Sequence, residues 1–114
     1  MLNQIVLVGR LVRDVQVHKT EKGKNIATVT LAIPRSFKNM DGLYDTDFIE
    51  CVLWENIALN TKQYCQKGNI VCVRGRVQTR KVEEAGVNKY ILQIIAEKVT
   101  SLTSKKDVDQ DSES

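Results

Sequence analysis

Phe48 and Trp54 are two of the few aromatic residues in this 114-residue chain, in which aromatics make up 5%. They lie six residues apart in a stretch with strand character, and even spacing in a strand places side chains on one face. Glu50 shares that face, whereas the other face is wholly apolar, with Ile49, Cys51 and Leu53. We therefore predict that the apolar set faces a core and that Phe48 and Trp54 are at least partly exposed.

Phe37 stands between Arg35 and Lys38, at the end of another strand-like stretch. Exposed aromatic rings beside basic side chains suit base stacking along a surface that follows a phosphate backbone. Packing under a loop or against a second subunit remains the alternative for each ring.

Arginines recur on one parity of residues 70–81, at Arg74, Arg76 and Arg80, opposite a row of valines. Such a row is either a solvated strand face or a phosphate-binding surface, whose affinity comes from counterion release and is independent of sequence. The basic residues Arg10, Lys67 and Lys81 favour the second interpretation.

Catalytic and metal-binding patterns are absent from the sequence. There is no phosphate-binding glycine loop, no nucleophile elbow and no histidine beside a candidate nucleophile. The three cysteines lack metal-ligand spacing and lie far from His18, so we interpret them as reduced core residues. We expect no enzymatic activity, no catalytic residue, no cofactor and no metal.

Charge divides the chain into a basic body and an acidic end. The total is +3, and residues 105–114 carry −2, so residues 1–104 carry +5. We expect residues 1–103 to form one domain with an anionic partner, and residues 104–114 to be a short acidic disordered tail. No targeting segment or membrane-spanning run is visible, which predicts a soluble, cytoplasmic protein.

Hydrophobic periodicity predicts five strands and one helix. The strands are expected over residues 4–13, 26–37, 45–54, 70–81 and 90–102, and the helix over 55–68 with Gly68 as its C-terminal stop. Gly9 suggests a bulge or bend, and Pro34 an edge. One helix between the third and fourth of five strands is the order of an all-β, five-stranded OB-fold barrel.

Several short motifs occur in an order that resembles the bacterial single-stranded DNA-binding protein family. Over roughly residues 2–102 they are Asn3-x-x-x-Leu7-Val8-Gly9-Arg10-Leu11-x-x-Asp14, Leu31-Ala32, Val52-Leu53-Trp54, Tyr64-x-x-Lys67-Gly68 and Val73-x-Gly75-Arg76-x-x-Thr79-Arg80. The resemblance implies an OB-fold that forms a homotetramer and binds single-stranded DNA in replication, recombination or repair.

The resemblance also assigns roles to residues. Together with the patterns above, it predicts that DNA contacts are made by Arg10, Arg35, Phe37, Lys38, Phe48, Trp54, Lys67, Arg76, Arg80 and Lys81. The predicted subunit interface comprises Gln4, Val6, Val8, Ile49, Cys72 and Arg74.

Departures from the family pattern make the chain similar to short paralogues and mobile-element versions. Val82 replaces a common aromatic, Lys19 stands where a tyrosine is frequent, and Val15 replaces a proline. The Gly/Gln-rich linker and Asp-Ile-Pro-Phe tip are missing, so recruitment of repair or replication proteins through the tail is not expected. Two alternatives stay open: a primosome-accessory module that acts through protein partners, and an RNA-binding OB domain.

Overall fold

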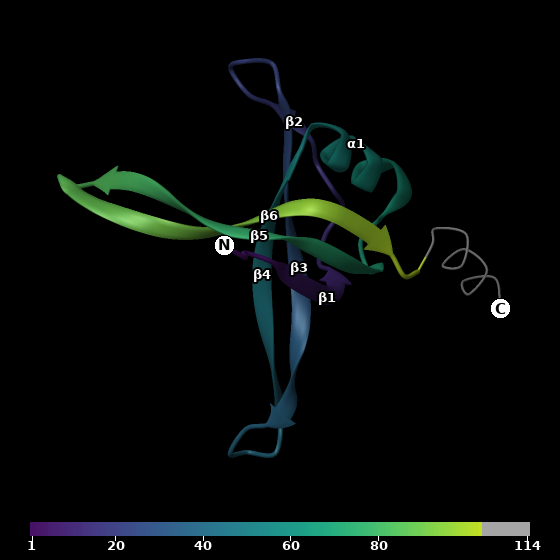
Figure 1. Ribbon diagram of the computed structural model, residues 1–114. Coiled ribbons are helices and arrows are strands. Elements are labelled where there is room, and N and C mark those ends of the chain that lie inside the picture. Colours follow the sequence, from purple (N-terminus) through teal and green to yellow (C-terminus); the bar gives the residue numbers. More distant parts are fainter. Residues whose placement is uncertain (104–114) are drawn as a thin grey trace.

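The computed structural model describes residues 1–103, which form a small barrel with one helix (Figure 1). The predicted tail, residues 104–114, lies outside the described residues. The elements are β1 (Ile5–Leu11), β2 (His18–Lys19), β3 (Asn25–Lys38), β4 (Tyr44–Trp54), α1 (Glu55–Tyr64), β5 (Ile70–Glu84) and β6 (Val87–Ser101).

Five of these strands close into the predicted OB-fold. The sheet order is β1-β5-β6-β4-β3-β2, and an additional β1–β3 pairing joins its ends into a barrel. Neighbours are antiparallel except for β4 and β6, which pair in parallel at Cys51–Ile94 and Val52–Ile95. Helix α1 lies between β4 and β5 in sequence, as predicted, and at the opposite end of the barrel from the β3–β4 turn (Figure 1).

The core is built from alternate residues of the barrel strands. Its largest fully buried apolar side chains are Leu11, Leu31, Leu53, Val71, Val73 and Cys51. Period-2 patterning places these apolar residues on the inner face, so the prediction that Cys51 and Leu53 face the core is confirmed. Ile49 also packs against this core, although it is only partly buried.

Two glycines allow neighbouring strands to approach closely at the barrel seam. A Cβ on Gly75 would lie 2.0 Å from the carbonyl oxygen of Ile95, beside a register shift between β5 and β6. A Cβ on Gly9 would lie 2.7 Å from Cγ1 of Ile33. The β1–β5 register runs through Gly9 without a shift, so of the predicted bulge or bend no bulge occurs in this pairing, and the glycine allows close packing.

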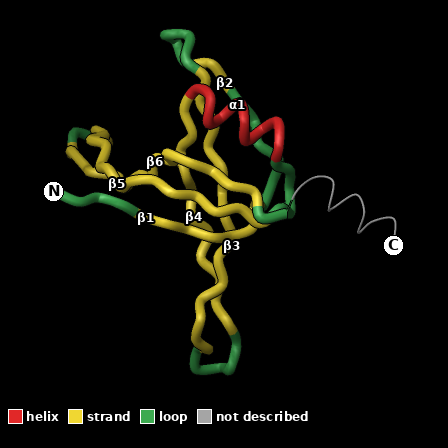
Figure 2. Tube along the Cα trace, turned by 45° about the vertical axis from the view of Figure 1, so that its right-hand side comes forward, coloured by secondary structure: helices red, strands yellow, loops and turns green. Residues whose placement is uncertain are grey.

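Two hairpins extend beyond the barrel as arms, visible in both orientations (Figure 2). The β3–β4 arm comprises residues 34–47; beyond Ala32 the pairings of β3 are with β4, which confirms the edge predicted at Pro34. The β5–β6 arm comprises residues 78–93 and turns at Ala85 and Gly86, whose φ values are 53° and 77°. Two adjacent positive φ values are typical of a type I′ hairpin turn.

Helix α1 ends earlier than the sequence predicted. It stops at Tyr64, and Gly68 lies in the following turn with φ 90°, where its N–H donates to the carbonyl of Leu11 at 2.9 Å. Ala58, Thr61 and Cys65 are buried, whereas Tyr64 is 60% exposed. The short strand β2 was not predicted, because two residues carry no periodicity.

None of the helices in residues 1–103 has the length and apolar character needed to cross a bilayer.

Candidate nucleic-acid interface

Strand β4 presents its even-numbered side chains on the outside of the barrel. Phe48 is 67% exposed and Trp54 is 36% exposed, so the predicted exposure of both rings is confirmed. Val52 and Glu50 lie between them on the same face. The row offers two aromatic rings on one rigid strand, about 20 Å apart at ~3.3 Å per residue.

Arginines flank this row on both sides. Arg10 of β1 pairs with Ala32 of β3, which pairs with Phe48, so all three share the outer face. The Arg10 guanidinium donates to the carbonyl of Gly68 at 2.6 Å, which holds it in place.

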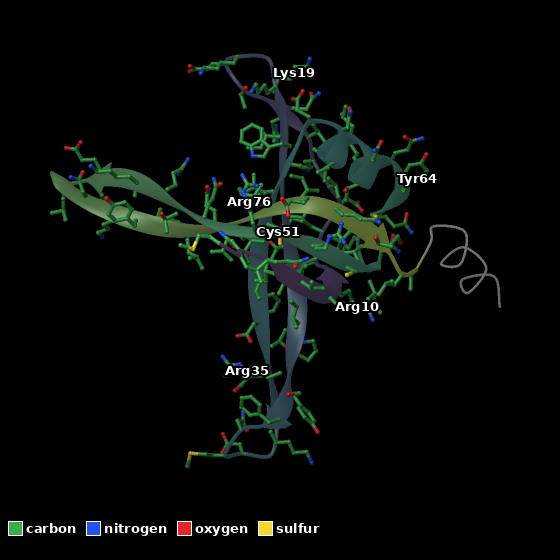
Figure 3. The ribbon with its side chains drawn as sticks, in the orientation of Figure 1. Arg10, Lys19, Arg35, Cys51, Tyr64 and Arg76 are labelled. Atoms are coloured by element: carbon green, nitrogen blue, oxygen red, sulfur yellow. The ribbon has the colours of Figure 1, made fainter. Side chains whose placement is uncertain are left out.

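Arg76 occupies the other side of the row. It pairs with Ile95 of β6, which in turn pairs with Val52 of β4. Its guanidinium donates to Oε1 of Gln78 at 3.1 Å, and Figure 3 shows it where β5 and β6 cross over β4. All four side chains, those of Arg10, Phe48, Trp54 and Arg76, lie on the outside of the barrel, with Arg10 two strands from β4 on one side and Arg76 two strands from it on the other. We call this outer surface, centred on β4, the β4 face.

Trp54 forms the wall of a surface pocket at the upper end of this face. The pocket, of about 500 Å³, is also lined by Thr20, Glu21, Lys22 and Lys24. The sequence analysis assigned no role to residues 20–24 and missed these two lysines. Trp54 is also the residue that precedes α1, which ties its position to the helix.

Arg35 is engaged with aspartates on the β3–β4 arm. Its Nε donates to Oδ2 of Asp47 at 3.1 Å, its NH2 donates to Oδ1 of Asp47 at 3.0 Å, and NH1 lies 3.7 Å from Asp45. The hydrogen bond and charge of Arg35 lower the pKa of Asp47, and Asp47 in turn raises the pKa of Arg35. The charge of Arg35 is thus largely compensated within the protein.

Phe37 and Lys38 lie further out on the same arm, and both are exposed. Lys38 pairs with Tyr44 across the hairpin, and its Nζ lies 5.8 Å from the centre of the Tyr44 ring. Tyr44 is 57% exposed and shares strand parity with Phe48 and Trp54. The sequence analysis missed Tyr44 because it began this strand at residue 45; the even spacing would have identified it.

Arg80 and Lys81 are exposed on the β5–β6 arm but point to opposite faces, because they are adjacent in a strand. Arg80 pairs with Ile91, and Lys81 pairs with Tyr90. Arg80 therefore lies on the same face of β5 as Arg76, and Lys81 lies on the opposite face.

Lys67 lies in the loop between α1 and β5. Its backbone N–H donates to Oδ1 of Asp14 at 2.7 Å. The hydrogen bond from Arg10 to Gly68 places Arg10 beside this loop. Lys67 therefore lies near Arg10 and on neither of the two arms.

The residues predicted for the subunit interface fall into two groups. Val6 pairs with Arg74 and Val8 with Cys72, so these four share the outer face of β1 and β5, and Gln4 precedes them. Val6 is 58% exposed and Val8 48%. Ile49 is not on this face: it pairs with Leu31 on the core side of β4.

Residues 1–103 contain His, Cys, Asp and Glu side chains, the types that bind metal ions or act as nucleophiles. No cluster of three or more His, Cys, Asp or Glu side chains suited to a metal ion occurs there. Burial raises the pKa of the Cys51 thiol to about 11, so this side chain is an unreactive core residue at neutral pH.

Comparison with known proteins gives a consistent result. The model of the single-strand binding protein family matches residues 2–102. The chain is 47% identical to single-stranded DNA-binding protein B of Bacillus subtilis (strain 168), over 92% of this chain and 94% of that protein. It is 45% identical to single-stranded DNA-binding protein 3 of Listeria innocua, over 93% of this chain and 67% of that protein.

A third relative, the single-stranded DNA-binding protein of Lactiplantibacillus plantarum, is 40% identical, and the matched region spans only 53% of its length. The family match extends over almost all described residues and includes every strand that carries the β4 face. The resemblance found in the sequence motifs is thereby confirmed, and the chain belongs to the single-strand binding protein family.

Proposed function

We propose that this chain binds single-stranded DNA without sequence preference on the β4 face, and that it covers and protects single strands during replication, recombination or repair. The observation that carries the proposal is the pair of exposed rings on β4, Phe48 and Trp54, with Arg10 and Arg76 on either side. Rings stack on any base and guanidiniums bind any phosphate, so the surface reads no sequence.

Family membership supports a binding protein and not an enzyme. The names of the relatives also favour single-stranded DNA over the primosome-accessory alternative, since each refers to DNA binding. Nucleotide binding by stacking and phosphate contacts requires no cofactor or metal.

The test is fluorescence anisotropy with labelled dT, rU and mixed-sequence duplex of equal length, each measured over a range of salt concentrations. We expect the tightest binding to dT, and log K that falls with log salt at about −0.7 per phosphate neutralised. Equal or tighter binding to the duplex contradicts the proposal, and a preference for rU favours the RNA-binding alternative.

Self-association, most simply as a homotetramer, is a second part of the proposal. It is supported by the exposed apolar side chains Val6 and Val8 on β1, next to Cys72 and Arg74 of β5. Apolar residues on both faces of a strand favour a second surface that covers the outer one.

We also propose that residues 1–103 are sufficient for binding and that the protein acts in the cytoplasm. Residues 105–114 carry a charge of −2, which repels phosphate. Truncation after Thr103 should leave the affinity for dT unchanged or slightly higher at low salt; a large loss of affinity contradicts this division.

A further inference from the structure

Tyr44 continues the outer row of aromatic side chains on β4. It is the first residue of that strand and has the same parity as Phe48 and Trp54. Four residues of strand separate it from Phe48, about 13 Å at ~3.3 Å per residue. With 57% of its surface exposed, the side chain is more accessible than that of Trp54.

Lys38 is the partner that holds this ring. The register shift in β3 between Pro34 and Lys38 brings Lys38 directly opposite Tyr44. Its ammonium lies 5.8 Å from the ring centre, a distance typical of a cation–π contact. The ammonium covers one side of the ring, and the exposed remainder is available for a second flat group.

Two carboxylates of the same arm, Asp45 and Asp47, lie away from this pair. Asp45 and Asp47 have the opposite parity on β4, so they point to the other face of the hairpin. Both interact with Arg35, and Asp45 also accepts a hydrogen bond from Asn39 at 3.2 Å. A phosphate that approaches Tyr44 therefore meets the ammonium of Lys38 first. One face of the arm carries Arg35 with its two aspartates, and the opposite face carries Tyr44 with Lys38.

We propose that Tyr44 is a third base-stacking residue of the β4 face and that Lys38 contacts the phosphate of the nucleotide stacked on it. The inference rests on the proposed single-stranded DNA binding and extends it along the β3–β4 arm. The DNA path then follows one strand from the pocket at Trp54, past Phe48, to the arm that carries Tyr44. Lys38 orders the ring before DNA arrives, which reduces the conformational entropy lost on binding.

The experiment compares Tyr44→Ala and Tyr44→Phe with the matched control Tyr64→Ala, using anisotropy of labelled dT at fixed salt. Tyr64 is 60% exposed but lies on α1, outside the β4 row. We expect Tyr44→Ala to weaken binding at least about fivefold, the lower end of the cost of one lost stacked base. Tyr44→Phe keeps the ring and should bind like the unaltered protein, as should Tyr64→Ala.

Lys38→Gln provides the second readout. If Lys38 contacts a phosphate, this variant should reduce the slope of log K against log salt by about 0.7. Irradiation of the complex with 5-iodouracil-substituted DNA, followed by mass spectrometry, should give an adduct at Tyr44 and none at Tyr64.

Several outcomes overturn the inference. The inference is wrong if Tyr44→Ala binds dT as tightly as Tyr64→Ala does. It is also wrong if Tyr44→Phe loses as much affinity as Tyr44→Ala. A fall in melting temperature without a change in affinity assigns Tyr44 a structural role only. In each of these cases the unaltered protein still binds dT, whereas failure of the unaltered protein to bind dT refutes the proposed function itself.

Discussion

Phe48 and Trp54 share a strand face but differ in how firmly the fold holds them. Phe48 is 67% exposed and lies within β4, a strand with a paired neighbour on each side. Trp54 is only 36% exposed and is the residue that precedes α1. Truncation of the two side chains should therefore have different effects on stability, even if both rings stack on bases.

Phe48→Ala should weaken binding to dT by ~1–3 kcal/mol, the cost of one stacked base, with little change in melting temperature. Trp54→Ala should weaken binding similarly but also lower the melting temperature, since most of its side chain is covered. Titration and thermal melt on each variant measure both effects, with Phe48→Tyr as the control that keeps a ring. Unchanged Trp54 fluorescence on addition of dT would remove Trp54 from the binding surface.

Arg35 is a predicted DNA contact whose charge is compensated by carboxylates of its own arm. Because Arg35 lowers the pKa of Asp47, the carboxylate is fully ionised above its ordinary pKa of 3.8, and the pair is lost only as pH falls through the lowered value. At neutral pH the two charges compensate each other, so Arg35→Gln should change the salt slope less than Arg10→Gln.

Asp47→Asn should remove the closer partner of Arg35, leaving Asp45 at 3.7 Å, and should increase the magnitude of the salt slope by up to ~0.7, with tighter binding at low salt. Asp41→Asn is the matched control, because it removes a carboxylate of the same arm that forms none of the salt bridges found in residues 1–103. Equal effects of the two variants would mean that only the net charge of the arm matters.

At the scale of elements, closure of the barrel depends on the approach of β5 to β6. Gly75 lies where the register shifts, and no side chain fits there because the Ile95 carbonyl would be 2.0 Å from its Cβ. The strands on either side of this point carry Arg76 and Ile95, which link β5 to the β4 face. The position of the proposed binding surface thus depends on a residue that has no side chain.

Gly75→Ala should destabilise the protein by several kcal/mol, since backbone must move to accept the methyl group. Gly42→Ala is the control: its site is open, and only the positive φ of 77° adds a cost, of ~1–2 kcal/mol. Urea unfolding of both variants measures the difference. A Gly75→Ala protein as stable as the Gly42→Ala protein would show that the β5–β6 contact relaxes easily.

For the whole molecule, the exposed outer face of β1 and β5 is the surface that a second copy would cover. Light scattering at micromolar concentration should report a multimer, and Val8→Glu should shift it toward the monomer, because a buried carboxylate without a partner is costly. Cys72 pairs with Val8 and is partly exposed in the single chain, so its thiol should react faster in Val8→Glu. The interface is contradicted if the unaltered protein is a monomer. It is also contradicted if the Cys72 thiol reacts equally fast in the unaltered protein and in Val8→Glu.

Local patterning was sufficient to predict the element order, the inner and outer faces of β4 and the exposure of Phe48 and Trp54. These features follow from period-2 alternation, which depends only on neighbouring residues. The same local rules failed at the end of α1 and at the start of β4, where a one-residue error concealed Tyr44, and they did not show the close packing at Gly9. Element ends are decided by contacts with distant residues, as the hydrogen bond from Gly68 to Leu11 shows.

Only the tertiary structure decided which charged residues remain available to a ligand. The sequence identified Arg35, Arg10, Arg80 and Lys81 as equivalent basic candidates, but the fold pairs Arg35 with Asp47 and places Arg80 and Lys81 on opposite faces of one arm. Arg10 reaches the row of Phe48 through Ala32, a neighbour 22 residues away in the chain. Charge compensation and shared faces depend on strand register between distant segments, and register is a property of the closed barrel rather than of any segment alone.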